Sequence, residues 1–250
     1  MNKICGKGAW VQLLELDTEL FGFVCGELFL EPGLPLVEDI TRLTYKAEAE
    51  DIVHITAKLR AEEVDRAKVL QSAGFRLMIS SMDLEKKIFG VYNALPDRVS
   101  LANEKDLGQL MHISRLSFAS STRFHFDDMM GKDKATELYV RWIKNLLQDP
   151  GVVVLTHLSV DIPDGFITVR LDDKDTAHID LYAVAPEIRH NGIGNMLLMA
   201  AEASVQGRAQ KLSVRTECIN YAALNVYTRA GFKIAGCLNA FHWSAAKEKP

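Results

Sequence analysis

A glycine-containing loop in the second half of the sequence has the residue types that hold a phosphate. The loop reads Arg189-His190-Asn191-Gly192-Ile193-Gly194, between a segment expected to be a strand and one expected to be a helix. Its glycines let backbone N–H groups come close to an anion, and a helix start favours negative charge. No Gly-Lys-Ser/Thr follows, so it is not a Walker loop, and Met196 and Leu197 do not fit the dinucleotide pattern. The loop alone predicts a phosphate-sized turn, with a plain tight turn as the alternative.

A second group of residues lies on the next expected helix, at 221–230. Asn220, Ala223 and Tyr227 fall on one face of that helix, which ends before a Gly-Phe pair. A tyrosine at this position can reach a ligand that lies along the preceding strand. The alternative is a core aromatic residue whose hydroxyl group is satisfied within the protein.

Strands that alternate with helices must position these two groups. Periodicity and turn residues predict strands at 99–101, 151–156, 165–171, 177–184, 212–216 and from 232 onward, and helices after Asn103 and at 134–147, 195–206 and 221–230. The run Asp172-Asp173-Lys174-Asp175 is expected to form a turn. The alternation predicts a mixed α/β sheet.

The first half of the sequence repeats part of this pattern. A shift of 157 positions places Ala73-Gly74-Phe75 on Ala230-Gly231-Phe232 and Lys58 on Arg215. A duplicated strand–helix–strand unit and a chance likeness between two such units are both open. The first copy has no counterpart of the glycine loop, so we expect it to be structural or to shape an acceptor pocket. The proline and polar residues at 93–98 predict a boundary between one domain at 1–95 and a second at 96–250.

The strand end Leu181-Tyr182-Ala183-Val184-Ala185-Pro186, the glycine loop and the helix with Asn220 and Tyr227 together resemble the GCN5-related N-acetyltransferases (GNAT). The resemblance spans roughly residues 97–246. It implies an α/β (α+β) fold with a mixed, mostly antiparallel central sheet flanked by helices. It also implies a smaller, degenerate GNAT-like domain at 1–95, a catalytic domain at 96–250, and acetyl-CoA as the co-substrate.

The resemblance assigns a role to each residue on the cofactor side. The pantetheine arm would contact the backbone of Tyr182, Ala183 and Val184. The glycine loop from Arg189 to Gly194 would take the pyrophosphate, and Asn220 would contact the cofactor as well.

The implied reaction is direct transfer of an acetyl group to a neutral amine, without an acyl-enzyme. A backbone N–H near Val184 can stabilise the oxyanion, and Tyr227, beside the thioester sulfur, is the candidate general acid for the leaving thiolate. His178, Asp180 and Tyr182 alternate on one strand face, and Asp180 is the first choice for the general base. A solvated or hydrogen-bonded Asp180 is the alternative.

Two further segments, at 16–23 and 118–127, resemble the subgroup that acetylates dTDP-linked 4-amino-4,6-dideoxy sugars. The resemblance implies the amino group of a nucleotide-linked sugar as the acceptor. Arg123 can pair with a phosphate, while His125 and Asp127 can bind hydroxyl groups or serve as the base. A surface loop with an anchoring aromatic residue is the alternative. Another small amine, a peptide or protein amine, and a non-catalytic acyl-CoA-binding module stay open as other functions.

Composition argues against several other classes of protein. The 250 residues are 48% hydrophobic and 25% charged with a net charge of −4, which indicates a globular protein without general affinity for nucleic acid or membranes. No apolar run is long enough to span a bilayer, and Lys7 and Gly8 interrupt any signal-like start. No C-x-x-C pair and no Cys/His cluster with zinc spacing occurs, so we expect free thiols, a cytoplasmic location and no metal. The expected partner is a small-molecule amine, and a homodimer stays open.

Overall fold

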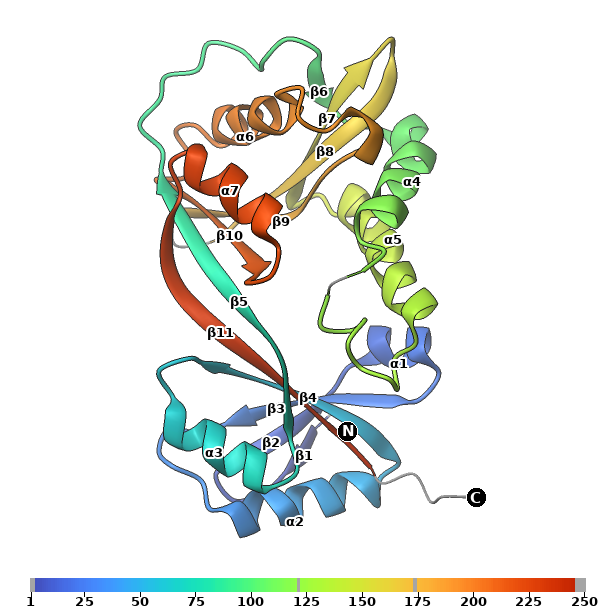
Figure 1. Cartoon of the computed structure of the whole chain (residues 1–250), viewed down its shortest axis with the longest axis vertical. Coiled ribbons are helices and arrows are strands. Elements are labelled where there is room, and N and C mark those ends of the chain that lie inside the picture. The colour runs from blue at the N-terminus through green and yellow to red at the C-terminus, as the bar shows by residue number, and fades with distance from the viewer. Residues whose placement is uncertain (1–2, 121, 173–174, 246–250) are drawn as a thin grey trace.

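A single sheet runs through both halves of the chain in the computed structural model, which describes residues 3–120, 122–172 and 175–245 (Figure 1). Within these residues the sheet has 11 strands in the order β1-β2-β3-β4-β11-β5-β10-β9-β8-β7-β6. Its pairs are antiparallel except for β3 with β4 and β9 with β10, which are parallel. The predicted mixed, mostly antiparallel sheet flanked by helices is therefore confirmed. Asp173 and Lys174 of the predicted turn lie outside the described residues.

The strands are short at the two edges of the sheet and long in its centre, which leaves little edge open to pairing with other chains. Their bounds are β1 (Lys3–Cys5), β2 (Ala9–Leu13), β3 (Val24–Leu30), β4 (Ile52–Arg60), β5 (Arg76–Lys87), β6 (Val99–Leu101), β7 (Val152–Ser159), β8 (Ile162–Leu171), β9 (Thr176–Val184), β10 (Lys211–Glu217) and β11 (Lys233–Ser244).

The helices cover both faces of the sheet. Their bounds are α1 (Glu15–Phe21), α2 (Val37–Glu48), α3 (Val64–Ser72), α4 (Leu107–Ser117), α5 (Lys132–Gln148), α6 (Ile193–Ser204) and α7 (Tyr221–Arg229), with short 3-10 turns η1 (Glu104–Asp106) and η2 (Pro186–Ile188). None of the helices in the described part of the chain has both the length and the apolar composition needed to cross a membrane.

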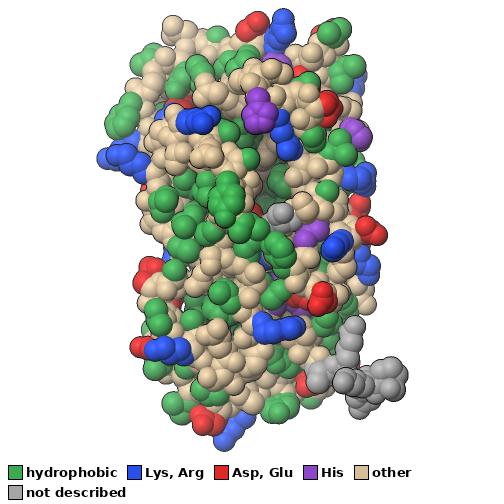
Figure 2. Space-filling view, in the orientation of Figure 1, with side chains coloured by type: hydrophobic (Ala, Val, Ile, Leu, Met, Phe, Trp, Pro, Cys, Tyr) green, Lys and Arg blue, Asp and Glu red, His purple; other side chains and the backbone are tan. Residues whose placement is uncertain are grey.

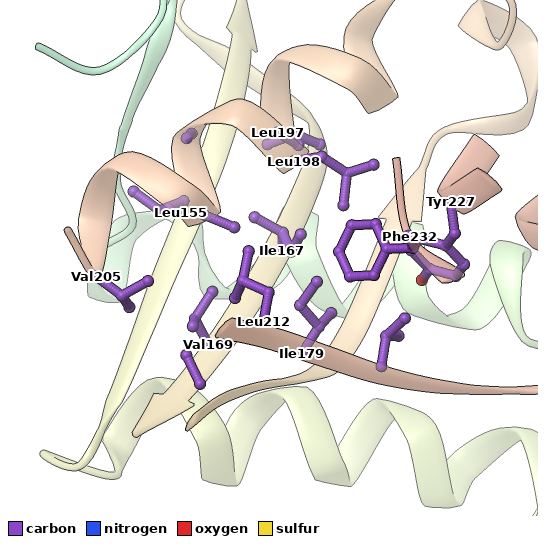
Figure 3. Packing of buried hydrophobic residues seen from close by; sticks show 14 of the residues in the cluster. Leu155, Ile167, Val169, Ile179, Leu197, Leu198, Val205, Leu212, Tyr227 and Phe232 are labelled. Carbon is purple, nitrogen blue, oxygen red and sulfur yellow. The ribbon is translucent and has the colours of Figure 1, made fainter. Parts of the chain in front are cut away.

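Side chains that alternate along the strands make two cores in the second half. On β8, Ile167 belongs to the cluster that packs under α6 and α7, whereas its neighbour Phe166 belongs to the cluster under α4 and α5. Figure 3 shows the first cluster, in which Leu197 and Leu198 of α6 face Ile167 and the other strand residues. Burial of each such side chain contributes about 1.5–3 kcal/mol, so packing holds α6 and its first turn against β8 and β9.

A pseudo-two-fold axis relates the halves and passes between the two long central strands. The shift of 157 positions seen in the sequence carries the bounds of β5 onto those of β11 and the bounds of α3 onto those of α7. The pairing has the same symmetry, because Lys233 pairs with Glu85 and the equivalent residues Arg76 and His242 pair with each other. The structure therefore supports a duplicated unit over a chance likeness.

Each half of the chain gives its last strand to the other half of the sheet. β11 lies between β4 and β5, and β5 lies between β11 and β10. Figure 1 shows these two strands as the long connection between the upper and lower parts of the molecule. The predicted boundary near residue 95 falls in the irregular segment at 88–98. The division into domains at 1–95 and 96–250 stays a prediction.

Several predicted element boundaries differ from the observed ones by one to three residues, and two of them bear on the site. Helix α6 begins at Ile193 instead of Asn195, because Gly192 adopts a left-handed conformation and acts as the N-cap. Strand β8 begins at Ile162 instead of Gly165. The last two residues of the glycine loop thus form the first turn of α6.

Candidate active site

The parallel strands β9 and β10 separate along their length. The last of their four residue pairs joins Val214 to Ile179, after which β9 continues to Val184 and β10 to Glu217. Among the described residues, these ends do not pair with each other. Unpaired backbone N–H and C=O groups need partners, so the edge of β9 that faces this gap can hydrogen-bond an extended ligand.

A bulge in β9 lies beside the gap. The register with β8 shifts between Ile167 and Val169, so that Asp180 and Leu181 oppose the single residue Thr168. The N–H of Leu181 donates to Oγ1 of Thr168 at 2.8 Å, which satisfies the backbone at the bulge. Bulges re-aim strands next to active sites, and here the bulge directs the end of β9 toward the glycine loop.

The glycine loop presents its backbone N–H groups at the start of α6. His190 and Gly192 are left-handed, with φ angles of 70° and 82°. Left-handed residues in a turn direct neighbouring N–H groups toward a common centre, and the first N–H groups of a helix lack intrahelical partners. The helix dipole adds partial positive charge. This geometry suits a diphosphate.

Side chains of the loop hold its shape. Arg189 donates from Nε to the carbonyl oxygen of Val184 at 3.0 Å, and from Nη2 to Oγ of Ser117 at 3.3 Å. Asn191 donates from Nδ2 to the carbonyl oxygen of Ile188 at 3.2 Å. These contacts tie the loop to the end of β9 and to α4, so the N–H groups are fixed before a ligand binds.

Gly194 lies directly under the ring of Tyr182. A Cβ atom at position 194 would overlap the hydroxyl oxygen of Tyr182, so glycine is required for the present packing. The ring of Tyr182 in turn lies 5.8 Å from the ring of Tyr227. Packing thus connects the glycine loop to the predicted general acid.

Replacing Gly194 with alanine is expected to raise KM for acetyl-CoA about tenfold, a loss of about 1.4 kcal/mol. The added methyl group forces Tyr182 or the first turn of α6 to move. Gly108→Ala is the matched control, because a Cβ there would meet nothing within 4 Å. Steady-state kinetics with varied acetyl-CoA would measure the effect. Equal KM values for the two variants would show that Tyr182 moves freely and that the loop does not need the glycine.

Tyr227 and Asn220 lie on α7, across the gap from β9. Tyr227 is 4% exposed and packs against Phe232 with ring centroids 5.5 Å apart (Figure 3). Burial raises the pKa of Tyr227 well above its usual range, with smaller contributions from Tyr182 and Glu217. Its hydroxyl group therefore stays protonated at neutral pH, as a general acid requires.

Asn220 caps α7. Its Oδ1 accepts from the N–H of Ala223 at 3.2 Å, and its Nδ2 donates to Oγ1 of Thr216 at 3.2 Å. Both polar atoms of the side chain thus have partners in the chain. The predicted contact of Asn220 with the cofactor stays a prediction.

The gap opens into a cleft with a volume of about 1700 Å³. The glycine loop, β9, β10 and α7 line one end of it, and β4, β5 and β11 line the other. Figure 2 shows that this face of the molecule is hollowed near its middle, with hydrophobic side chains around the hollow. The cleft therefore has room for a second substrate beside the cofactor, on walls that come from both halves of the chain.

Charged residues of the first half face the cleft, and sequence reasoning assigned them no role. Asp83 forms ion pairs with Arg60 and with Arg215, the latter at 2.6 Å from Nε to Oδ1. Burial raises the pKa of Asp83, but the two arginines outweigh it, and the pKa lies below its usual range. Lys58 pairs with Glu27 at 2.8 Å. The match of Lys58 to Arg215 in the repeat was the signal that could have found these residues.

Glu217 is a further carboxylate in the cleft that sequence reasoning missed. It ends β10, beside the gap, and no side chain among the described residues hydrogen-bonds or ion-pairs with it. Burial raises its pKa, and this outweighs the opposing influences of its own backbone N–H and of Arg123. A carboxylate with a raised pKa and no side-chain partner among the described residues can accept a proton from a substrate.

Asp180, the general base chosen from the sequence, also lines the cleft, but its carboxylate is already paired with Arg170. Its Oδ2 accepts from Nε of Arg170 at 3.1 Å, and Arg170 also pairs with Asp149. Burial raises the pKa of Asp180, although Arg170 opposes the shift. This placement matches the hydrogen-bonded alternative, and the catalytic role stays a prediction.

The three acceptor-side residues are placed differently from one another. Arg123 lines the cleft, stacks over Phe124 at 4.4 Å and forms no salt bridge with any described residue. His125 is outside the cleft wall, and its ring nitrogens contact hydroxyl oxygens of Thr122 at 2.7 Å and Thr136 at 3.1 Å. Only Arg123 of this group is therefore positioned to meet an acceptor directly.

Asp127 is buried away from the cleft between two histidines. Its Oδ2 lies 2.9 Å from Nε2 of His54 and 2.6 Å from Nδ1 of His242, and its Oδ1 accepts from the N–H of Met129 at 3.0 Å. Burial raises the pKa of Asp127, but these hydrogen bonds outweigh it and hold the pKa well below its usual range. Asp127 therefore shapes the loop that carries Arg123 instead of lining the cleft.

A family model matches the part of the chain that holds this site. Residues 120–232 match the model described as the acetyltransferase (GNAT) family. The matched segment, which is less than half of the chain, is similar to that family. No curated protein matches the chain.

Solved GNAT structures share the fold over nearly the whole chain. A GCN5-related N-acetyltransferase from Sphaerobacter thermophilus has a TM-score of 0.64 at 12% identity, covering 95% of this chain and 76% of its own. One from Kribbella flavida has a TM-score of 0.65 at 13% identity, covering 98% and 90%. A tandem GNAT protein from the clavulanic acid biosynthesis pathway has a TM-score of 0.63 at 13% identity, covering 96% and 80%. These likenesses show the fold alone.

Proposed function

We propose that the protein is an acetyl-CoA-dependent N-acetyltransferase that transfers acetyl directly to a primary amine. The observation that best supports this proposal is the gap between β9 and β10, which ends at the glycine loop and opens into the cleft. GNAT enzymes use acetyl-CoA as a co-substrate, and this gap has the shape and the free backbone groups for its pantetheine arm.

The cofactor would run from the glycine loop to Tyr227. Its pyrophosphate would lie against the N–H groups between Arg189 and Gly194, and its pantetheine arm along the backbone from Tyr182 to Val184. The thioester would then lie between the end of β9 and α7. This path is supported by the fixed loop and by the unpaired edge of β9.

The chemistry follows from that placement. A neutral amine attacks the thioester carbonyl, and a backbone N–H near Val184 stabilises the oxyanion. The tetrahedral intermediate collapses as the C–S bond breaks, and Tyr227 donates to the leaving thiolate. The amine proton passes to a carboxylate on the cleft wall. The acetylated amine and CoA are the products.

Glu217 is the better candidate for the base, because Asp180 is tied to Arg170. Glu217→Gln is expected to lower kcat/KM about tenfold at neutral pH, less than the full range of general-base catalysis, because the ammonium intermediate can also lose its proton to water. The rise of kcat/KM with pH that reports ionisation of Glu217 should disappear from the profile. A tenfold loss in Asp180→Asn with an unchanged Glu217→Gln would reverse the assignment.

The proposed acceptor is the amino group of a nucleotide-linked amino sugar. Arg123 supports it, because a guanidinium that lies in a cleft and has no salt bridge to any described residue suits phosphate oxygens. Phe124, which also lines the cleft, offers an aromatic surface near that charge. The depth of the cleft toward β4 and β5 leaves space for a nucleotide.

An acetylation screen tests the function and the acceptor together. Release of free CoA thiol would be followed with dTDP-linked amino sugars, polyamines and peptides as acceptors. Turnover with the amino sugars, and a higher KM for them in Arg123→Ala, would support the proposal. Turnover with polyamines or peptides alone would show that the acceptor is one of these amines and not a nucleotide-linked amino sugar. Tight CoA binding without transfer to any amine would identify a non-catalytic acyl-CoA-binding module.

A further inference from the structure

Two histidines and an aspartate meet in the interior, where the two halves of the sheet join the acceptor-side loop. His54 is on β4, His242 is on β11 and Asp127 is in the loop between α4 and α5. One potential ligand atom from each residue lies within 4.8 Å of the others. The two imidazole rings meet edge to face, with centroids 4.9 Å apart. The three side chains thus converge on one point from distant segments.

This cluster is closed to solvent and incompletely satisfied. His54 is 0%, His242 2% and Asp127 5% exposed. Both histidines direct a nitrogen at the same carboxylate oxygen, so one oxygen serves two rings. The second nitrogen of each ring, and Oγ1 of the neighbouring Thr56, have no hydrogen-bond partner among the described residues. Buried polar atoms without partners are rare in folded proteins, and this cluster concentrates three of them.

We propose that His54, Asp127 and His242 form a binding site for one divalent transition-metal ion, for which Zn²⁺ has the best-matched ligand preference. Two imidazole nitrogens and one carboxylate oxygen are a known three-residue zinc ligand set, in which a water molecule is the fourth ligand. Bonds of roughly 2.0–2.1 Å in a tetrahedral site place ligand atoms about 3.3 Å apart. Ligand atoms that lie within 4.8 Å of one another reach that spacing with small side-chain movements.

The coordination balances in protons, and one carboxylate reduces the charge of the bound ion to +1. The ion replaces the hydrogens that the rings now share with Asp127, and the displaced proton of each ring moves to its other nitrogen. Thr56 Oγ1 is a buried acceptor on a neighbouring position, because Thr56 pairs with His242 and lies two positions from His54 on β4. No oxidant or reductant is needed.

A metal at this point would have a structural role. None of the three ligands lines the cleft, whereas Arg123 and Phe124, from the same loop as Asp127, do. The ion would fasten this acceptor-side loop to β4 and β11. It would therefore stabilise the protein and fix the cleft wall without touching the cofactor.

Zinc content and thermal stability test the proposal without an activity assay. The untagged full chain would be loaded with Zn²⁺, passed through gel filtration and analysed for bound metal. We expect about one tightly bound equivalent per chain in the wild type, a higher Tm after loading, and loss of both in His242→Gln and Asp127→Asn. His157→Gln is the matched control, because His157 is a buried histidine paired with Asp164 at 2.6 Å outside the cluster.

Several outcomes would overturn the site. A wild type with no retained zinc and an unchanged Tm would leave the cluster as a hydrogen-bonded clamp. An equivalent of zinc that persists in His242→Gln and Asp127→Asn would place the metal elsewhere, for example on the free cysteines. If either variant fails to fold, the visible absorption of wild type loaded with Co²⁺ distinguishes the proposed site from a cysteine site. Ligation by two nitrogens and one oxygen gives no thiolate charge-transfer band, whereas ligation by cysteine does. Absence of acetyl transfer would affect the proposed function and leave this test intact.

Discussion

Phenylalanine in place of Tyr227 is expected to lower kcat about 100-fold while KM for acetyl-CoA changes little. The ring keeps its packing against Phe232 and Tyr182, whose centroids lie 5.5 and 5.8 Å away. Only the hydroxyl group is lost, and with it the donor for the departing thiolate. Stopped-flow or steady-state measurement of CoA release would give kcat, and denaturant unfolding would confirm that stability is unchanged.

The control for this variant is Tyr45→Phe, which removes a hydroxyl group from an exposed tyrosine on α2. Its kcat should match that of the wild type. A Tyr227→Phe enzyme as fast as the wild type would contradict the proposed role. Tyr227 would then be a core aromatic residue, which the sequence left open as the alternative.

Phe241→Ala is expected to lower the free energy of unfolding by about 3–5 kcal/mol. Phe241 is 1% exposed, and although it lies on the last strand of the chain, it packs in the core made by β1 to β4, α2 and α3. Removing the ring leaves a cavity in a core that belongs almost entirely to the first half of the sequence. Chemical denaturation followed by fluorescence and circular dichroism would measure the loss.

Ile234→Ala is the matched control on the same strand. Ile234 is 62% exposed, so its truncation should change stability by less than about 0.5 kcal/mol. Hydrogen exchange adds a second readout, since Phe241→Ala should weaken protection in β4 and α3 most. Protection lost only near β10 would show that β11 does not complete the first half.

The positions of the glycine loop and of α7 in the fold could be predicted because their signals are local in sequence. The glycine loop and α7 each lie within one strand–helix unit, so spacing placed the loop between a strand and a helix and placed Tyr227 on the next helix. The exact start of α6 could not be predicted, because it depends on the left-handed backbone of Gly192.

The acceptor side and the exchange of strands could not be predicted in the same way. The repeat predicted that β5 and β11 are equivalent, but periodicity does not specify which strand lies beside which. In the sequence Glu217 is an ordinary residue at the end of a strand, and only the separation of β9 and β10 in the structure places it in the cleft. The expectation of no metal came from sequence spacing, whereas His54 and His242 are 73 and 115 positions from Asp127.

The exchanged strands have a consequence for how this chain is made. β11 follows all the other strands in the sequence, yet it fills the place between β4 and β5. The first half emerges from the ribosome with one edge of β4 unpaired. That edge gains its partner only when β11 has been synthesised. Pairing over such separations slows folding and exposes unpaired edges to aggregation. We therefore expect the newly made first half to depend on chaperones until β11 has been synthesised.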